Sequence, residues 1–202
     1  MFFSIICLSI IIALIGHSWI TQLFMHNKSY IDEKRLTPYA SISLLAAAIS
    51  CCFLLAYIRC TTIAEVIHFI IPSIFLLFTC ISDLMGNIIF TRMMIPFAIL
   101  AIPFMFTSAL PSWDYLLAAA TGGASFLIFA MLSHGGIGGG DVRLVAVLGL
   151  WLGSSRLLYA CISGILLGGV AALILLLVTR SRHTAFPYGP FIAIPAIIVL
   201  LP

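Results

Sequence analysis

The sequence alternates long apolar runs with short polar connections, and eight such runs follow one another along the chain. Most are close to the roughly 20 residues that a helix needs to cross the hydrocarbon core of a bilayer. Apolar residues follow one another within them without the alternation of a half-buried strand, and only helices or closed barrels satisfy the backbone inside lipid. The runs therefore predict helices at residues 2–25, 39–58, 62–82, 93–110, 115–133, 142–153, 157–179 and 191–201.

The sixth and eighth runs are short for a full span, so we expect them to be tilted, re-entrant or partly outside the core. The predicted fold is an all-α, polytopic transmembrane helix bundle of about six to eight spans. Composition supports a membrane protein, because 63% of the residues are apolar and 7% are charged, against about 25% charged in soluble domains. The first run is too long for the core of a signal peptide, so we expect a retained helix. No polar linker or repeat divides the chain.

The charged residues indicate an orientation rather than a nucleic-acid partner. The net charge is +3, but the nine basic residues are scattered and form no patch, so we expect no nucleic-acid binding. Cytoplasmic loops of membrane proteins carry an excess of Lys and Arg. The even-numbered connections carry only two basic residues, whereas the odd-numbered ones carry seven. The even ones carry Arg59 and Arg156, and the odd ones carry Lys28, Lys34, Arg35, Arg92, Arg143, Arg180 and Arg182. The odd-numbered connections are therefore predicted to be cytoplasmic and the N-terminus outside.

The six cysteines lie in or at the ends of apolar runs and form neither a C-x-x-C pair nor a Cys/His cluster with zinc spacing. We expect them to act as small apolar side chains. The sequence therefore predicts no metal site and implies no cofactor.

Asp83 stands out among the six acidic residues because it ends an apolar run of about 20 residues. At the C-terminal end of a helix, the helix dipole disfavours an anion. An interfacial Asp can simply be hydrated, but carboxylates at membrane depth are mostly functional. Asp83 is therefore a candidate catalytic residue.

Asp141 follows a segment, 135–140, in which five of six residues are glycine. An Asp after a glycine turn is an ordinary helix N-cap, which is one interpretation of Asp141. The glycines favour a second interpretation, because they allow an extended substrate to approach the backbone beside the carboxylate. The glycine pairs at 122–123 and 168–169 lie inside apolar runs and are typical of close helix packing.

The remaining acidic residues have simpler interpretations. Asp32 and Glu33 share a loop with basic residues and are expected to be solvated. We expect Asp114 to cap a helix that starts at Tyr115. For Glu65, one turn into the third run, structural and functional roles stay open.

Two carboxylates on one side of the membrane suggest a catalytic pair formed by Asp83 and Asp141. Two such groups in close approach do not both ionise easily, so they share a proton. One carboxylate then acts as general base on water and the other as general acid. Two aspartates are also able to bind a divalent cation, although no further acidic residue is near them in the sequence. Two roles stay open for His134, beside the glycine segment: it influences the protonation of the pair, or it is an ordinary loop histidine.

Three segments together resemble one known family, the type IV prepilin peptidases. The stretch Gly138-Gly139-Gly140-Asp141-Val142-Arg143-Leu144, continuing to Leu148-Gly149 and Gly153, is similar to their G-x-G-D segment. Ser82-Asp83-Leu84, with Ile89 six residues after the aspartate, resembles their first catalytic motif. Phe186-Pro187-Tyr188-Gly189-Pro190-Phe191 resembles the proline–glycine–proline turn near their C-terminus. The three motifs occur in the order that the family has.

The resemblance implies a metal-independent aspartyl endopeptidase of the bacterial inner membrane, active toward the cytoplasm. Its substrates would be prepilin or pseudopilin precursors of type IV pilus or protein secretion systems, cut between a short basic leader and an apolar helix. The chain would consist of N-terminal transmembrane helices with a short cytoplasmic loop at 1–61 and a protease core at 62–202. The implied catalytic pair is Asp83 and Asp141. Substrate-binding or loop-shaping residues would be Gly138, Gly139, Gly140, Arg143, Pro187, Gly189 and Pro190.

The sequence departs from the family pattern at three places. Phe90 follows Ile89 where the family has proline, and Arg143 stands where it has lysine. The loop at 26–38 is short and has no cysteine, whereas bifunctional members carry a cysteine-containing region there for N-methylation. We therefore expect peptidase activity without methyltransferase activity.

Two other functions fit the same apolar sequence. The chain could be a small proton-coupled transporter or channel in which the two aspartates relay protons. It could also be a catalytically silent relative that assists pilus assembly by binding pilins.

Overall fold

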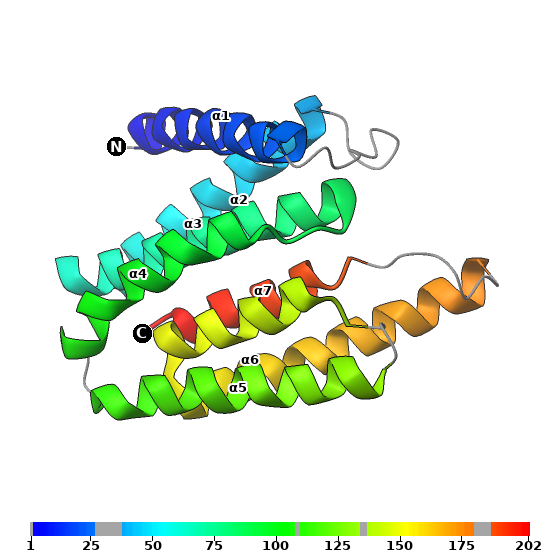
Figure 1. Cartoon of the computed structure of the whole chain (residues 1–202). Helices are drawn as coiled ribbons and strands as arrows, with labels where there is room; N and C mark the ends of the chain where they lie inside the picture. Colours follow the sequence, from blue (N-terminus) through cyan, green and yellow to red (C-terminus); the bar gives the residue numbers. More distant parts are fainter. Residues whose placement is uncertain (1, 27–37, 108–109, 134–136, 180–186) are drawn as a thin grey trace. The chain divides into compact units, whose positions relative to one another are not determined.

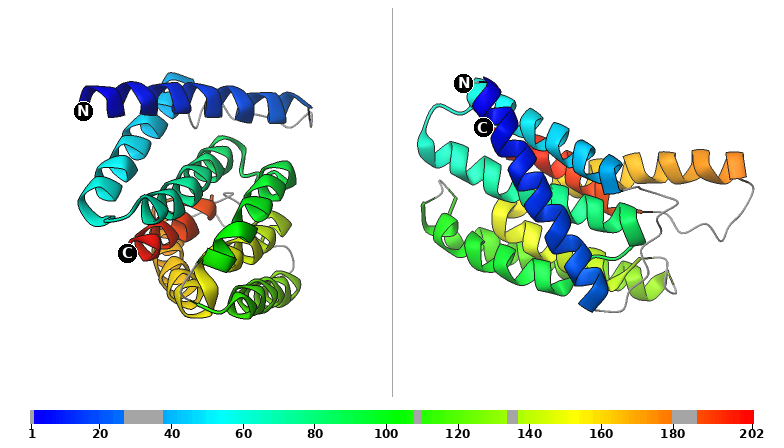
Figure 2. Two further views of the ribbon diagram at one scale, coloured as in Figure 1. Left: turned by 90° about the vertical axis from the view of Figure 1, so that its left-hand side faces the viewer. Right: turned by 90° about the horizontal axis from the view of Figure 1, so that it is seen from above.

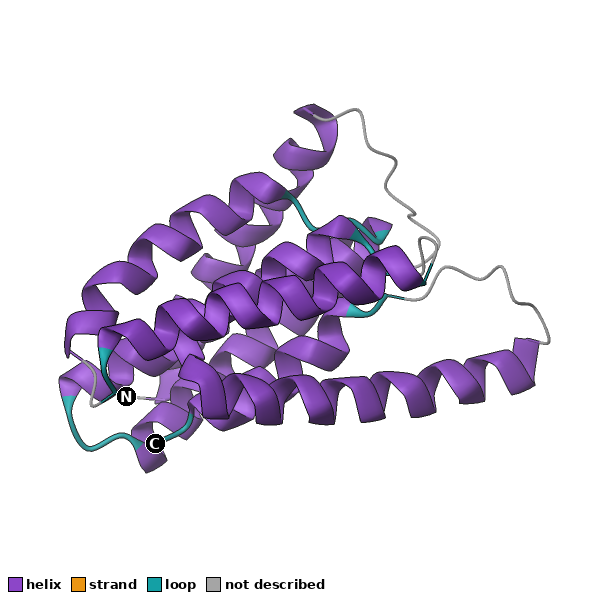
Figure 3. Cartoon of the chain, turned by 60° about the horizontal axis from the view of Figure 1, so that its bottom comes forward, coloured by secondary structure: helices purple, strands orange, loops and turns teal. Residues whose placement is uncertain are grey.

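The computed structural model describes residues 2–26, 38–107, 110–133, 137–179 and 187–202, and all regular structure in these ranges is helical. Figures 1 and 3 show this all-α architecture, which the apolar runs predicted. The seven helices of the described ranges are α1 (Phe2–His26), α2 (Pro38–Arg59), α3 (Ile63–Gly86), α4 (Thr91–Thr107), α5 (Ser112–Leu132), α6 (Gly139–Thr179) and α7 (Gly189–Leu200).

Five of these helices (α1, α2, α3, α5 and α6) are long and apolar enough to cross a membrane. Large apolar side chains are exposed along them, as on Ile15, Ile58, Leu116 and Leu166. Such a surface is unfavourable in water and suits the lipid core of a bilayer. The described part of the chain therefore has the surface of a multi-pass membrane protein.

Helix α6 is broken once, at Gly153, whose φ of 73° and ψ of 175° are not helical. Figure 1 shows the ribbon reversing its direction there, between its yellow and orange parts. The helix thus consists of two arms, 139–152 and 154–179, that run in opposite directions. A left-handed φ is easily adopted only by glycine, so this single residue makes the turn. The sequence predicted two separate helices here, but it placed the start of the second at 157 rather than at 154.

A side chain from another helix stabilises this turn. The Ser154 backbone N–H donates to Oδ2 of Asp114 at 2.9 Å, and the Ser154 hydroxyl donates to Oδ1 at 2.7 Å. Asp114 therefore caps the second arm of α6, because it accepts an N–H that has no partner within that arm. The expectation that Asp114 caps a helix starting at Tyr115 was wrong, since α5 already begins at Ser112.

The chain forms two compact units. The first contains α1, α2 and α3 with residues 201–202, and the second comprises residues 89–200 with α4 to α7. Inside the first unit, the ring of Phe78 on α3 occupies the space beside Gly16 on α1, where an added Cβ would lie 2.3 Å from the ring. The division at residues 61 and 62 stays a prediction.

In the second unit, glycines allow α5 and α6 to approach closely. A Cβ on Gly149 would lie 2.4 Å from the backbone nitrogen of Ala119, and one on Gly123 would lie 3.0 Å from the Cβ of Ala146. Small residues at such crossings are typical of membrane helices. The prediction of helix packing is confirmed for Gly122 and Gly123. Gly168 instead lies against the ring of Tyr188, which precedes α7, and a Cβ on Gly169 would meet nothing within 4 Å.

The two short apolar segments are deeply buried. Leu144, Val145 and Leu148 in the first arm of α6 are fully buried, as are Ile192 and Ala196 in α7. The first arm has 14 residues and spans about 21 Å at 1.5 Å per residue, less than the hydrocarbon thickness of roughly 30 Å. By contrast, Figure 2 shows the orange end of the second arm extending past α5 and α7. The first arm therefore forms interior structure, whereas α7 is buried on one side and exposes Ile194 and Ile198 on the other.

Candidate active site

Asp83 lies in the last turn of α3 and is buried, with 5% of its surface exposed. It is the one buried residue among the four acidic residues that the structure describes. Asn87 ends the helix in the left-handed conformation, and its backbone N–H donates to the Asp83 carbonyl at 2.7 Å. The interpretation of Asp83 as a simply hydrated surface residue is not supported, because water reaches little of it.

Asp141 is the third residue of α6 and is half-buried. Its Oδ2 accepts the backbone N–H of Gly138 at 3.2 Å, while its own N–H donates to the Gly138 carbonyl at 3.1 Å. This pair of bonds orients the carboxylate at the start of the helix. Gly138 rather than Asp141 precedes the first helical residue, so the interpretation of Asp141 as the N-cap was wrong by three positions.

The three glycines before Asp141 have different surroundings. A Cβ on Gly140 would lie 2.8 Å from the Cβ of Ile89, and one on Gly138 would lie 3.3 Å from Oδ2 of Asp141. A Cβ on Gly139 would meet nothing within 4 Å. Packing therefore requires a glycine at 140 and leaves room for a side chain at 139.

We expect Gly140→Ala to impair the peptidase activity that the sequence resemblance implies more strongly than Gly139→Ala. A methyl group at 140 must displace Ile89 and with it the segment that leads into α4, which costs about 1–3 kcal/mol. The measurement is cleavage of a candidate precursor by equal amounts of membrane-embedded protein. Gly139→Ala is the matched control, since it adds the same methyl group one residue away into open space. Equal activities of the two variants would contradict the packing argument.

Arg143 connects α6 to α4. Its guanidinium donates a hydrogen bond to the hydroxyl of Thr91, the first residue of α4. Sequence reasoning assigned Arg143 to the substrate or to the loop, and the structure places it in a contact within the protein. Thr91 was not predicted, because a partner 52 residues away in the sequence leaves no local signal.

The Pro187–Pro190 turn leads into α7 and is completed by a hydrogen bond from the Phe191 N–H to the Tyr188 carbonyl at 3.1 Å. The Tyr188 ring lies against Gly168, where an added Cβ would be 2.5 Å from it. Burial raises the pKa of the Tyr188 phenol, and the charges of Asp141 and Cys161 add to this rise. Tyr188 is thus close enough to sense Asp141, although only its neighbours were predicted as site residues.

The contacts of Gly140 with Ile89 and of Arg143 with Thr91 tie the start of α6 to the start of α4. The electrostatic effect of Asp141 on Tyr188 places the turn before α7 in the same neighbourhood. Three segments that the sequence singled out are therefore gathered around Asp141. Asp83 belongs to the other unit, and its pairing with Asp141 stays a prediction.

Glu65 has a structural role. Its backbone N–H donates to the Thr62 hydroxyl at 3.2 Å, and its carboxylate accepts the N–H groups of Thr61 and Thr62 at 2.8 and 3.4 Å. This reciprocal arrangement is a capping box, which satisfies the free N–H groups at the start of α3. Of the two roles left open for Glu65, the structure supports the structural one.

Asp32, Glu33, His134 and the loop at 27–37 lie outside the described residues. In the described ranges, no three His, Cys, Asp or Glu residues come together in a group that would hold a metal ion.

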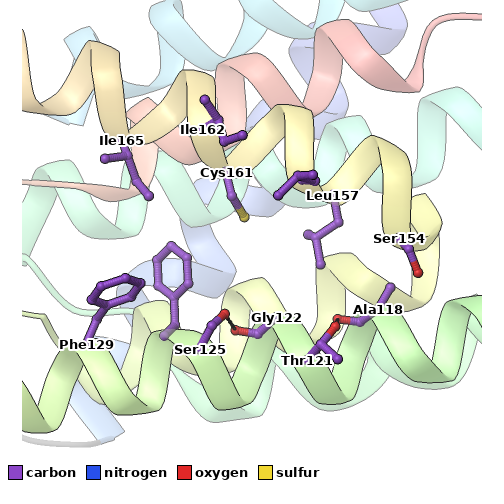
Figure 4. Close-up of a pocket in the computed structure, with 12 residues that line it drawn as sticks. Ala118, Thr121, Gly122, Ser125, Phe129, Ser154, Leu157, Cys161, Ile162 and Ile165 are labelled. Carbon is purple, nitrogen blue, oxygen red and sulfur yellow. Dashed lines mark hydrogen bonds between the residues drawn. The ribbon is translucent and has the colours of Figure 1, made fainter.

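A hollow of about 370 Å³ lies between α5 and the second arm of α6. Figure 4 shows Phe129 and Ser125 from α5 facing Leu157, Cys161 and Ile165 across it. The hydroxyls in its wall already have partners, since Thr121 donates to the Leu117 carbonyl, Ser125 to that of Gly122 and Ser154 to Asp114. The hollow therefore offers apolar contact and no acidic or basic side chain.

Comparisons with known proteins point to one family. Residues 70–173, which include both Asp83 and Asp141, match the model of the type IV leader peptidase family. The prepilin leader peptidase/N-methyltransferase of Bacillus subtilis (strain 168) is 30% identical over 182 residues, which cover 89% of this chain and 72% of that protein. A protein with the same description from Xanthomonas campestris pv. campestris is 34% identical over 96 residues, 45% of this chain and 33% of that protein. No solved structure matches the chain.

Proposed function

Because the chain belongs to the type IV leader peptidase family, we propose that it is a membrane-embedded aspartyl endopeptidase that removes the leader peptide of prepilin or pseudopilin precursors. The observation that carries the proposal is that the stretch matching the family contains a buried aspartate at the end of α3 and a half-buried one at the start of α6. The similarity to two prepilin leader peptidases supports the choice of substrate.

In the proposed mechanism Asp83 and Asp141 approach each other in the enzyme–substrate complex and share one proton. Two carboxylates in close contact cannot both ionise easily, so the pair carries one negative charge. The ionised member removes a proton from a water molecule, which attacks the carbonyl carbon of the scissile peptide. The protonated member donates its proton to the carbonyl oxygen, and the member that took the proton from water then donates that proton to the leaving amine. The burial of Asp83 supports the protonated role for this residue, because burial disfavours a charge.

The other predicted site residues are proposed to shape the surroundings of Asp141. Gly138 and Gly139 are exposed and leave the backbone accessible to an extended substrate. Gly140 and Arg143 hold the start of α6 against the segment before α4. Pro187, Gly189 and Pro190 form the turn that places Tyr188 near Asp141.

We also propose that the catalytic face is cytoplasmic and that the membrane is the bacterial inner membrane. The connections before α4, α6 and α7 belong to the basic set of loops, and basic loops stay on the cytoplasmic side. Precursors with a short basic leader would reach the aspartates from that side. Cysteine accessibility to an impermeant reagent tests the orientation, using a cysteine introduced at exposed Gly139 in a variant without the native cysteines.

The test of the function is leader removal from a candidate precursor by the purified chain in liposomes. Cleavage at the junction of leader and apolar helix is the expected result. Binding of the precursor without cleavage would point to an assembly factor instead. Ion flux in liposomes without any precursor, together with an intact precursor, would point to a transporter.

The mature product is expected to carry an unmodified N-terminus when this chain is the only processing enzyme present. The loop at 26–38 contains no cysteine, whereas methyltransferring members of the family carry a cysteine-containing region there. Mass spectrometry of the mature substrate measures the modification directly, with the Bacillus subtilis relative as the positive control. A methyl group on the product of this chain would contradict the prediction.

A further inference from the structure

The segment that leads from α3 into α4, residues 87–91, ends with the first residue of α4 and is held at its first end by the first aspartate motif. We call this segment the connector. The Asn87 N–H donates to the carbonyl of Asp83 at 2.7 Å, and the hydroxyl of Ser82 donates to the carbonyl of Ile88 at 2.6 Å. Ser82 is fully buried, so this bond is shielded from water. The start of the connector is thus bonded to the two residues of that motif.

The second end of the connector is held by the other aspartate motif. Ile89 packs against Gly140, with 2.8 Å between its Cβ and the position of an added Cβ. The guanidinium of Arg143 donates to the hydroxyl of Thr91. Gly140 immediately precedes Asp141, and Arg143 follows it by two residues. The four ties described above therefore each involve a residue within two positions of one of the two aspartates.

We propose that the connector is a positioning element that sets the separation of the two carboxylates, with Ser82 and Thr91 as its positioning residues. The inference rests on the proposed function, because it assigns these residues to the same catalytic pair. Neither hydroxyl is required to touch the substrate. Each acts by holding one end of a five-residue segment against the motif of one aspartate.

The energetic argument is the steep dependence of catalysis on geometry. A displacement of about 1 Å in a catalytic arrangement is able to cost 10²-fold in rate. Proton sharing between two carboxylates also weakens as they separate, and their two apparent pKa values then approach each other. Releasing the connector is therefore expected to change both the rate and the pH profile while the substrate-binding surface stays intact.

The experiment measures leader removal by Thr91→Val and by Ser82→Ala in the full chain in liposomes. We expect kcat to fall about tenfold or more, with KM within about twofold of the wild type. The two apparent pKa values of the kcat/KM profile are expected to move toward each other. A purely structural role would reduce the amount of folded enzyme without moving the pH profile.

A rescue variant and a control variant make the test more specific. Thr91→Ser keeps the hydroxyl acceptor and is expected to restore kcat and the profile. Thr121→Val is the matched control, since this hydroxyl bonds only within α5 and is expected to leave both unchanged. If Thr91→Val does not accumulate in the membrane, Arg143→Gln removes the same bond from the other side.

The double variant Ser82→Ala/Thr91→Val decides whether the two ends act through one element. If they do, it is no worse than the poorer single variant, because releasing either end already frees the connector. Multiplicative losses, or wild-type kcat and pH profile in Thr91→Val, would overturn the inference. The proposed function fails separately, if Asp83→Asn or Asp141→Asn still removes the leader.

Discussion

Asp83→Asn and Asp141→Asn are each expected to abolish leader removal, with kcat reduced by at least roughly 10³-fold. The amide has the size of the carboxyl group, so it leaves no cavity at buried Asp83. It cannot act as a general base or donate an acidic proton, so water activation and protonation of the leaving amine both fail. The measurement is single-turnover cleavage of a precursor by each purified variant in liposomes.

The control for these variants is Glu65→Gln, which removes an acidic group that only caps α3. It is expected to lower stability only slightly and to leave kcat unchanged. Folded yield and thermal unfolding of all three variants must be compared at the same protein level. Leader removal by either aspartate variant at more than about a tenth of the wild-type rate would exclude the pair as the catalytic machinery.

Gly149→Ala is expected to disrupt the packing of α5 against α6 and to lower stability markedly. The added Cβ would lie 2.4 Å from the nitrogen of Ala119 and 2.6 Å from the carbonyl carbon of Ala118. Backbone atoms cannot rotate away as a flexible side chain does, so the two helices must separate. Such overpacking costs about 1–3 kcal/mol or more. Thermal unfolding in detergent and the yield of folded protein in the membrane both measure this loss.

Gly169→Ala is the matched control, because it lies in the same helix and its Cβ would meet nothing within 4 Å. Alanine favours a helix over glycine by about 1 kcal/mol at both positions. Gly169→Ala is therefore expected to be as stable as the wild type or slightly more stable. Equal unfolding temperatures for the two variants would show that α5 and α6 do not pack as closely as described.

Apolar patterning predicted the helices well because the bilayer imposes strong rules. A chain inside lipid must satisfy every backbone polar group within its own segment, so each long apolar run forms a helix. With the two arms of α6 counted separately, the described helices start within three residues of all eight predicted runs. Even the interruption after 153 was visible, because polar Ser154, Ser155 and Arg156 follow the glycine.

Three short motifs were enough to predict the family. They resemble segments of the type IV prepilin peptidases, and the match over residues 70–173 confirms the family. Short motifs suffice for this, because the reaction requires particular residue types at fixed points of the chain. The assignment of Asp83 and Asp141 to catalysis stays a prediction that their replacement tests.

By itself the sequence determined the fold class, the family and the two candidate aspartates, since these follow from local composition and spacing. Only the tertiary structure decided which partner each polar side chain hydrogen-bonds. Asp114 caps Ser154, 40 residues away, and Arg143 bonds Thr91, 52 residues away. It also decided that Gly140 is required by packing while Gly139 is not. Such partners are chosen by the close approach of segments distant in the chain, which no local pattern records.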